Sequence, residues 1–222
     1  MKVALAQLSY IPGDIACNRD KIITAIEEAR RQGADLAVFS EMAVTGYPPL
    51  DLLHRTDIIS SAMAAVQEIA THCNGIAAIV GGPSPNTGVY GKSLHNSAFF
   101  LNDGRIRAVV NKALLPTYDI FDEDRYFQPG NVFQTVDFNG IRIAVTICED
   151  IWDEQPFGDR GLWRLYSVTP MDELMKEHPS LIINIAANPF SHNRIKVREE
   201  VFIRNAKEYR LPFISVNQTG GY

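Results

Sequence analysis

A strand-like stretch of this chain reads Ile141-Arg142-Ile143-Ala144-Val145-Thr146-Ile147-Cys148-Glu149-Asp150. The apolar run predicts a buried β-strand, and a cysteine at its C-terminal end is well placed to act as a nucleophile. The two carboxylates that follow disfavour the thiolate, which is the reactive form of cysteine. If Cys148 carries out chemistry, a cationic group and a base must therefore come to it from elsewhere in the chain.

Around this stretch, apolar runs alternate with amphipathic segments. Apolar residues recur with helical spacing, which predicts helices over 18–32, 57–73, part of 157–178, and 191–209. Short apolar runs predict strands over 2–9, 34–39, 76–80, 94–101, 106–110, 132–138, 141–147, 181–185 and 212–216. Turn residues at 102–104 and 139–140 predict hairpins, and Gly81-Gly82-Pro83 is expected to close the third strand. Crossover helices together with hairpins imply an α/β protein with one large mixed sheet, or two sheets, and helices outside.

Composition limits the classes of function. A chain of 222 residues with 46% hydrophobic residues suits one large domain, or at most two small ones. The net charge of -5 argues against a nucleic-acid or anionic-membrane surface, and no apolar run approaches the roughly 20 residues of a membrane helix. Three widely spaced cysteines (Cys17, Cys73 and Cys148) and the lack of a signal-peptide pattern predict a cytoplasmic protein with free thiols.

Two common ligand sites are disfavoured. Residues 86–93 (Asn-Thr-Gly-Val-Tyr-Gly-Lys-Ser) approach a phosphate-binding loop, but Asn86 stands where the first glycine belongs and a strand rather than a helix follows. The five histidines show no close ligand spacing, so we expect no metal site.

Two further strand ends carry charged residues. Glu41 follows the predicted strand 34–39, where partial burial raises the basicity of a carboxylate toward that of a general base. Lys112 follows the strand 106–110, and a lysine in apolar surroundings needs a carboxylate partner or a function. Taken singly, Glu41 could be a loop cap, Lys112 a surface lysine and Cys148 a structural cysteine. Because strand ends converge in α/β proteins, the three together predict a site in which Lys112 offsets the acids beside Cys148 and Glu41 takes the thiol proton.

These three residues, in this order, resemble the Glu-Lys-Cys triad of the nitrilase, or carbon-nitrogen hydrolase, superfamily. Further segments resemble the glutaminase domain of glutamine-dependent NAD synthetases, namely Ser40–Leu53, Leu115–Phe127, Ile147–Trp152, Asn96-Ser97-Ala98 and Asn188-Pro189-Phe190. The resemblance covers essentially the whole chain. It implies a nitrilase-like α-β-β-α four-layer sandwich, with two mixed sheets and helices outside.

The resemblance also implies roles for residues outside the triad. Glu123 corresponds to a second glutamate that positions Lys112 or the attacking water. Tyr118 corresponds to a tyrosine that contacts glutamine, and Arg194 to a basic residue six positions after Asn188. Asn188 itself stands where these domains usually carry a serine that holds the α-substituents of glutamine, and asparagine can donate and accept the same hydrogen bonds.

The implied reaction is hydrolysis of the side-chain amide of L-glutamine through a cysteine thioester. Glu41 takes the proton of Cys148, and Lys112 with the backbone N–H of Glu149 stabilises the oxyanion. The ammonia serves ATP-dependent amidation of deamido-NAD to NAD. We expect no cofactor in this domain, because ATP and Mg belong to a synthetase domain whose SGGxDS loop does not occur in this chain.

We therefore expect residues 1–222 to form one glutaminase domain, truncated at its C-terminus, that works with a linked or associated synthetase domain, and we expect a homo-oligomer. Two alternatives stay open. The chain could be a stand-alone amidase or nitrilase acting on another small amide, or a non-catalytic scaffold that uses the fold for assembly.

Overall fold

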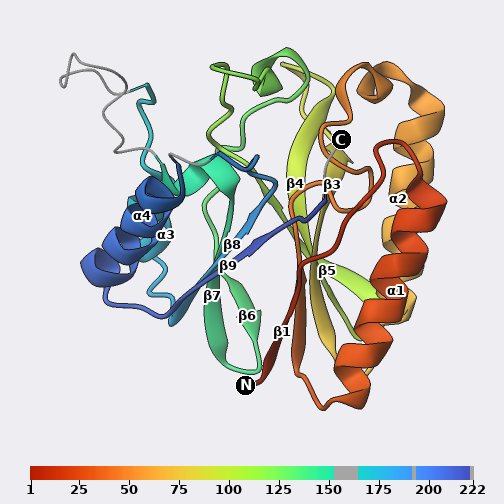
Figure 1. The fold of residues 1–222 in the computed structure, drawn as a ribbon, viewed down its shortest axis with the longest axis horizontal. Helices are drawn as coiled ribbons and strands as arrows, with labels where there is room; N and C mark the ends of the chain where they lie inside the picture. The colour runs from red at the N-terminus through yellow and green to blue at the C-terminus, as the bar shows by residue number, and fades with distance from the viewer. Residues whose placement is uncertain (153–164, 192–193, 221–222) are drawn as a thin grey trace.

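The computed structural model describes residues 1–152, 165–191 and 194–220, with the backbone alone described at residue 194. Two β-sheets lie face to face between two pairs of helices (Figure 1). The first sheet has the strand order β1-β2-β3-β4-β5, with bounds Val3–Ala6, Leu36–Phe39, Ala77–Pro85, Leu94–Asn102 and Arg105–Asn111. The second has the order β6-β7-β8-β9, with bounds Val136–Phe138, Ile141–Ile147, Leu181–Ala186 and Phe213–Asn217.

Both sheets are mixed. In the first, β1, β2 and β3 are parallel, while β4 is antiparallel to both β3 and β5. In the second, β6 and β7 form an antiparallel hairpin, and β7, β8 and β9 are parallel. The C-terminal ends of β2 and β5 consequently point to the same edge of the first sheet, which is where the sequence places Glu41 and Lys112.

The helices form the outer layers. α1 (Ile15–Arg31) and α2 (Thr56–Thr71) pack on the outer face of the first sheet, and α3 (Pro170–Met175) and α4 (Arg194–Tyr209) cover the second (Figure 1). Each layer presents an apolar face to its neighbour because neither a helix nor a sheet can bury such a face alone. The predicted four-layer α-β-β-α sandwich is confirmed.

The middle of the sandwich is an apolar core shared by the two sheets. Val38 and Ile79 of the first sheet pack in one cluster with Val145 and Ile183 of the second. The rings of Phe100 and Phe138 also meet across this layer, with centroids 5.8 Å apart. Burial of this layer from both sides ties the two sheets together and fixes the relative position of their strand ends.

Most predicted elements are present, with shifted ends. α1 begins before the predicted residue 18, because the Asp14 side chain accepts a hydrogen bond from the Cys17 N–H and caps the helix. Both hairpin turns are confirmed: Asp103-Gly104 and Asn139-Gly140 all have positive φ, as a type I′ turn requires. The strand predicted over 132–138 is only β6, and the prediction over 157–164 lies outside the described residues.

The prediction that Gly81-Gly82-Pro83 ends the third strand is wrong, since β3 continues to Pro85. These glycines serve close packing instead. A Cβ on Gly81 would lie 2.4 Å from the carbonyl oxygen of Ser40 and 2.7 Å from the Cα of Glu41. β3 therefore passes directly under the turn that carries Glu41, and only glycine leaves room for that turn.

Candidate active site

Four of the predicted site residues lie at or near the ends of strands of the two sheets. Glu41 follows β2, Lys112 follows β5 and Cys148 follows β7. Glu123 comes from the short 3-10 helix η2 (Glu123–Arg125), which lies in the long connection between β5 and β6. All four side chains are buried, and the exposed fraction of none of them exceeds 4%.

Lys112 is the centre of a hydrogen-bonded cluster. Its Nζ lies 2.7 Å from Oε1 of Glu41 and 2.9 and 2.8 Å from the two oxygens of Glu123. The side-chain amide of Asn96 donates to Glu41 at 2.7 Å and to Glu123 at 3.3 Å, and the Tyr47 hydroxyl donates to Glu123 at 3.1 Å. One ammonium thus faces two buried carboxylates, and neutral donors stabilise the excess negative charge.

The electrostatics of the cluster follow from burial and charge pairing. Burial alone would lower the pKa of Lys112, but the charges of Glu123 and Glu41 raise it well above its usual value, so Lys112 is an ammonium. Burial raises the pKa of Glu123 to about 7, against the lowering effect of Lys112. A carboxyl group that titrates near neutrality beside a fixed cation is typical of an active site.

Cys148 sits at a sharp turn between β7 and the 3-10 helix η3 (Cys148–Ile151). Its φ of 47° is in the left-handed region, which non-glycine residues rarely adopt and which is found most often at functional sites. The side chain of Asn184 in β8 donates to the Cys148 carbonyl oxygen at 3.4 Å, while Sγ donates to Oδ1 of Asn188 at 3.3 Å. β8 and the residues just after it therefore contact both the backbone and the thiol of this cysteine.

The charges around Cys148 make the thiol a weak acid in the absence of substrate. Burial raises its pKa well above the usual value, Glu41, Glu149 and Glu123 raise it further, and Lys112 lowers it. This agrees with the expectation that an adjacent acid opposes the thiolate and that Lys112 offsets it. Reactivity then depends on a base that removes the thiol proton as the substrate carbon is attacked.

Glu149, the first of the two acids after Cys148, is one of the groups that raise the pKa of the thiol. Glu149 is buried, and its carboxylate accepts hydrogen bonds from the hydroxyls of Tyr118 (2.8 Å) and Tyr166 (3.0 Å). Burial raises the pKa of Glu149, and the two hydroxyls lower it. Tyr118, which was predicted to contact the substrate, is therefore hydrogen-bonded to the residue that follows the cysteine.

Asp150, the second of these acids, has three backbone partners. Its carboxylate accepts hydrogen bonds from the backbone N–H groups of Ala113 and Leu114, both at 2.9 Å, and of Ile147 at 3.0 Å. Burial raises the pKa of Asp150 to about 6, although these N–H groups lower it. Beyond the charge expected of it from the sequence, Asp150 joins the end of β7 to the chain that follows β5.

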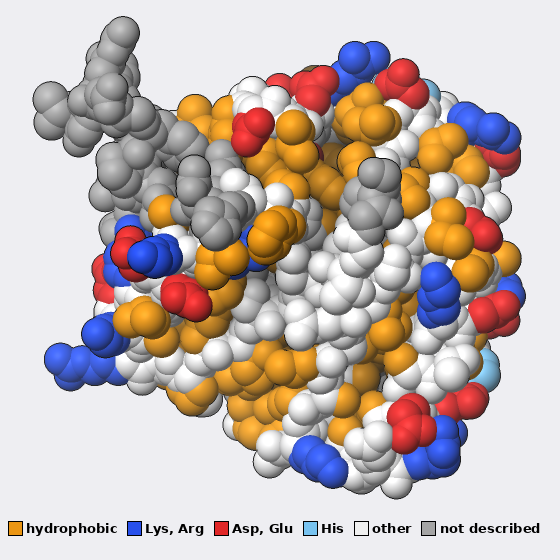
Figure 2. All heavy atoms as spheres, in the orientation of Figure 1, with side chains coloured by type: hydrophobic (Ala, Val, Ile, Leu, Met, Phe, Trp, Pro, Cys, Tyr) orange, Lys and Arg blue, Asp and Glu red, His pale blue; other side chains and the backbone are white. Residues whose placement is uncertain are grey.

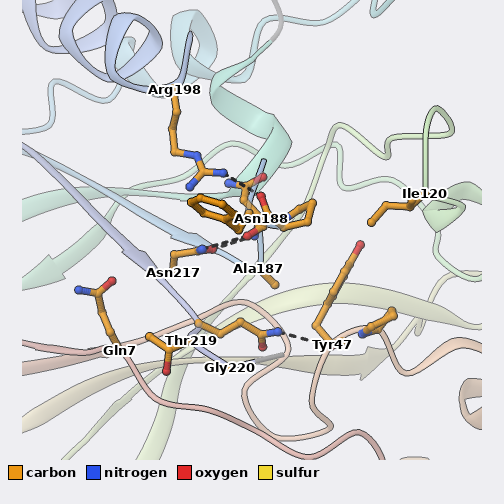
Figure 3. A pocket seen from close by; sticks show the side chains of 13 residues that line it. Gln7, Tyr47, Ile120, Ala187, Asn188, Arg198, Asn217, Thr219 and Gly220 are labelled. Atoms are coloured by element: carbon orange, nitrogen blue, oxygen red, sulfur yellow. Dashed lines mark hydrogen bonds between the residues drawn. The ribbon is translucent and has the colours of Figure 1, made fainter. Parts of the chain in front are cut away.

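A pocket of about 390 Å³ opens next to the cluster, and Tyr47, Ala187 and Asn188 line it (Figure 3). Each of the three also contacts the site. The Tyr47 hydroxyl donates to Glu123, the Ala187 N–H donates to Oε2 of Glu41 at 2.9 Å, and Oδ1 of Asn188 accepts from the thiol. Asn217 pairs with the Asn188 backbone in both directions, at 2.7 and 3.0 Å, and so fixes this wall of the pocket. A small polar molecule in this pocket would lie against the neighbours of Cys148, Glu41 and Glu123.

One arginine that was not predicted lines the pocket. It is Arg198, while the side chain of the predicted Arg194 lies outside the described residues. Two exposed apolar side chains are also part of the lining: Phe190 and Ile120, the second of which Figure 3 labels. The sequence therefore identified Asn188 as a pocket residue but not Arg198.

Three contributors to the site were not predicted: the Asn96 amide, the Tyr47 hydroxyl and the Ala187 N–H. Asn96 and Tyr47 lie in segments that carry the family resemblance, so that likeness was a signal for both. No side-chain pattern identifies a backbone donor such as Ala187. All three act on Glu41 or Glu123 across long sequence separations, which the sequence pattern does not report.

Among the described residues, three further features were compared with the expectations from the sequence: surface charge, metal ligands and membrane-spanning helices. On the face drawn in Figure 2, the described Lys and Arg side chains are interspersed with Asp and Glu. Within the described ranges, no group of three or more His, Cys, Asp or Glu side chains is arranged to hold a metal ion. None of the helices in those ranges is long and apolar enough to cross a membrane.

Comparison with known proteins gives a consistent result. Residues 2–155 match the family model described as carbon-nitrogen hydrolase. The chain is 38% identical over 223 residues to the glutamine-dependent NAD(+) synthetase of Synechocystis sp., covering 99% of this chain and 39% of that protein. It is 33% identical to the protein of the same name from Thermotoga maritima, covering 100% of this chain and 36% of that protein. The chain thus spans less than two fifths of the length of these curated relatives.

Solved structures agree with the sequence matches. The glutamine-dependent NAD+ synthetase of Acinetobacter baumannii superposes with a TM-score of 0.85 at 32% identity, covering 99% of this chain and 38% of that chain. An amidase from Nesterenkonia sp. superposes with a TM-score of 0.81 at 21% identity, covering 100% of this chain and 77% of that chain. At that identity the amidase supports the fold alone.

Proposed function

Because this chain belongs to the carbon-nitrogen hydrolase family, we propose that it hydrolyses the side-chain amide of L-glutamine and releases ammonia. The observation that carries the proposal is the Lys112 ammonium held between Glu41 and Glu123, next to a cysteine at a strained strand-to-helix turn. The names of the relatives, which are glutamine-dependent NAD synthetases, support glutamine as the amide.

In the first half of the reaction, Glu41 takes the proton of the Cys148 thiol as sulfur bonds to the carboxamide carbon. The carbonyl π pair moves to oxygen, and Lys112 together with the Glu149 N–H stabilises that oxyanion. Each such donor contributes about 3–4 kcal/mol to transition-state stabilisation. Protonated Glu41 then gives its proton to the amide nitrogen, the C–N bond breaks, and ammonia leaves a glutamyl thioester.

In the second half, water attacks the thioester carbon while Glu41 takes a proton from it. The C–S bond breaks, glutamate forms, and the proton returns to sulfur. Glu123, which grips Lys112 with both oxygens, keeps the ammonium in place through both halves. These steps use side chains and water, so ATP and Mg would serve only a synthetase domain.

Two of the residues expected to contact the substrate lie close to Cys148. Asn188 lines the pocket and accepts a hydrogen bond from the thiol. Tyr118 donates a hydrogen bond to Glu149, the residue that follows Cys148. We propose that these two residues, with Arg194, hold the α-amino and α-carboxylate groups of glutamine. Recognition of both charged groups would separate a glutaminase from a general amidase.

The ammonia would be consumed by a fused or associated synthetase domain that amidates deamido-NAD. The length of the relatives supports this, because the chain matches little more than a third of each. Residues 1–222 would then be the glutaminase domain of such an enzyme.

The test is ammonia release from L-glutamine by the chain, compared with Cys148→Ala and Lys112→Ala. We expect turnover by the unaltered chain and none above background in either variant, and wild-type-like turnover in either would overturn the triad. A panel that includes L-asparagine, 4-aminobutanamide and propionamide distinguishes the alternatives. Strong preference for L-glutamine supports the proposal, equal turnover of propionamide indicates an amidase, and no reaction with an electrophilic glutamine analogue indicates a scaffold.

A further inference from the structure

The side chain of Asn96 is a hydrogen-bond partner that the two buried carboxylates, Glu41 and Glu123, share. It belongs to β4, between β3 and β5 in the first sheet, and its side chain is fully buried. Its carbonyl oxygen accepts a hydrogen bond from the Lys112 N–H at 2.8 Å. The residue is therefore held by the same backbone that carries the lysine.

The side-chain amide of Asn96 has a defined orientation. Nδ2 donates to Oε1 of Glu41 at 2.7 Å and to Oε2 of Glu123 at 3.3 Å, whereas Oδ1 has no hydrogen-bond partner among the described residues. The reversed amide would turn the lone pairs of Oδ1 toward two carboxylates, which is repulsive. A buried acceptor is thus left unsatisfied so that the N–H₂ group can serve both acids.

The two oxygens of Glu41 consequently have different environments. Oε1 accepts from both Lys112 Nζ and Asn96 Nδ2, each at 2.7 Å. Oε2 accepts only one hydrogen bond from the described residues, from the Ala187 N–H at 2.9 Å. Ala187 is followed by Asn188, whose Oδ1 contacts the thiol, so the partner of Oε2 belongs to the same short segment that contacts Cys148.

We propose that Asn96 is a positioning residue that, together with Lys112, occupies Oε1 of Glu41 and leaves Oε2 as the atom that receives the Cys148 proton. An oxygen that already accepts two charge-assisted or amide hydrogen bonds is a poor proton acceptor, and one with a free lone pair is a better one. The inference rests on the proposed function, since it assigns an atom to the proton transfer described above.

An amide suits this position because of the charge of its surroundings. The titratable groups that face Glu41 are an ammonium, a thiol, a phenol and two carboxyls, namely Lys112, Cys148, Tyr47, Glu123 and Glu149. A carboxylate at position 96 would add a negative charge to this group and remove both donors. An alanine would remove the donors without adding charge.

The experiment compares Asn96→Ala and Asn96→Asp with Ser97→Ala. Ser97 is the adjacent buried residue in β4, and its hydroxyl bonds to Ser84 and Asn111, away from the acids. Two rates are followed from pH 5 to 8: glutamine turnover, and alkylation of Cys148 by iodoacetamide measured by mass spectrometry of its peptide. The alkylation assay needs no substrate, and the peptide masses distinguish Cys148 from Cys17 and Cys73.

For Asn96→Ala we expect kcat to fall by at least about tenfold, because the Glu41 carboxylate is no longer held in one orientation. KM should stay within about twofold of the wild-type value. Cys148 alkylation should fall in parallel, and Ser97→Ala should retain both rates. For Asn96→Asp the alkylation rate relative to wild type should rise as the pH falls, because only the protonated carboxyl adds no charge and can donate. Asn96→Ala should show no such rise.

Two results would overturn the inference. One is that the rate of Cys148 alkylation in Asn96→Asp, divided by the rate in wild type, does not change with pH. The other is a loss in Asn96→Ala that lies in KM or that Ser97→Ala reproduces, as expected of a purely structural residue. If wild type alkylates as described but releases no ammonia from glutamine, the proposed substrate is wrong and the role of Asn96 is still decided by the alkylation data.

Discussion

Asp150, in the second sheet's strand-end turn, accepts a hydrogen bond from the backbone N–H of Leu114, two residues beyond Lys112, at 2.9 Å. The same carboxylate accepts from Ala113 and Ile147, so three backbone groups from two sheets meet at one side chain. The lysine and the cysteine come from strands of different sheets. Asp150 is therefore a direct link that fixes one relative to the other.

We predict that Asp150→Asn lowers both stability and activity. The amide has the same shape as the carboxylate, but its N–H₂ group must replace an oxygen that accepts from a backbone N–H. At least one of the three hydrogen bonds is therefore lost. Leaving buried donors unsatisfied costs about 1–3 kcal/mol of unfolding free energy, and kcat should fall at least about tenfold because the cysteine and lysine are misplaced. Urea unfolding and glutamine turnover measure the two effects. Asp137→Asn, at an exposed hairpin position, is the control, and wild-type kcat in Asp150→Asn would contradict the prediction.

Removal of the cation should affect both the fold and the thiol. In Lys112→Met the carboxylates of Glu41 and Glu123 lose their shared partner, and an unpaired buried charge costs about 3–5 kcal/mol. Because Lys112 is the charge that lowers the pKa of Cys148, the thiol should also react more slowly. The rate of Cys148 alkylation at pH 7 tests this, with Lys92→Met, at a surface ion pair, as the control. An unchanged alkylation rate would show that the electrostatic argument is wrong, whatever the family.

The close pass of β3 under the Glu41 turn predicts a sharp difference between two neighbouring glycines. A Cβ on Gly81 would lie 2.4–2.7 Å from backbone atoms of residues 40–42, whereas a Cβ on Gly82 meets nothing closer than 3.4 Å. Gly81→Ala must therefore displace Glu41, and we expect kcat to fall at least about tenfold. Gly82→Ala should retain near-normal kcat and melting temperature. Equal effects of the two substitutions would rule out this role of Gly81.

The pKa of Glu123 predicts a pH-dependent stability difference. Burial raises this pKa to about 7, above the ordinary glutamate value of about 4.3. A carboxyl group with a raised pKa in the folded state contributes stability that is complete below the unfolded pKa and is lost as the pH rises through the folded pKa. Wild type should therefore lose, relative to Glu123→Gln, on the order of 3 kcal/mol of unfolding free energy between pH 4 and 8. Urea unfolding of both proteins measures it, and a difference of the opposite sign would mean that pairing with Lys112 outweighs burial.

The types of the elements, and the strands that precede the site residues, were well predicted from the sequence. Apolar periodicity located the strands that precede Glu41, Lys112 and Cys148, because side-chain spacing is a local property of a helix or strand. The same reasoning failed at Gly81, where a turn signal marks close packing in the middle of a strand. It also did not reveal that Asp150 links the ends of two strands, because the partners of that carboxylate depend on how the sheets pack.

The sequence by itself determined that three strands end in a carboxylate, an amine and a thiol, and that the chain forms an α/β fold with helices outside. The tertiary structure alone decided which atoms meet. The hydrogen bonds from Lys112 and Asn96 to Glu41 span 71 and 55 residues, and the one from Ala187 spans 146. Such contacts depend on the register of strands and on the apolar layer that joins the two sheets, and neither follows from local spacing. The hydrogen bonds of Glu41 and Lys112 are therefore products of packing, although the residues themselves could be read from the chain.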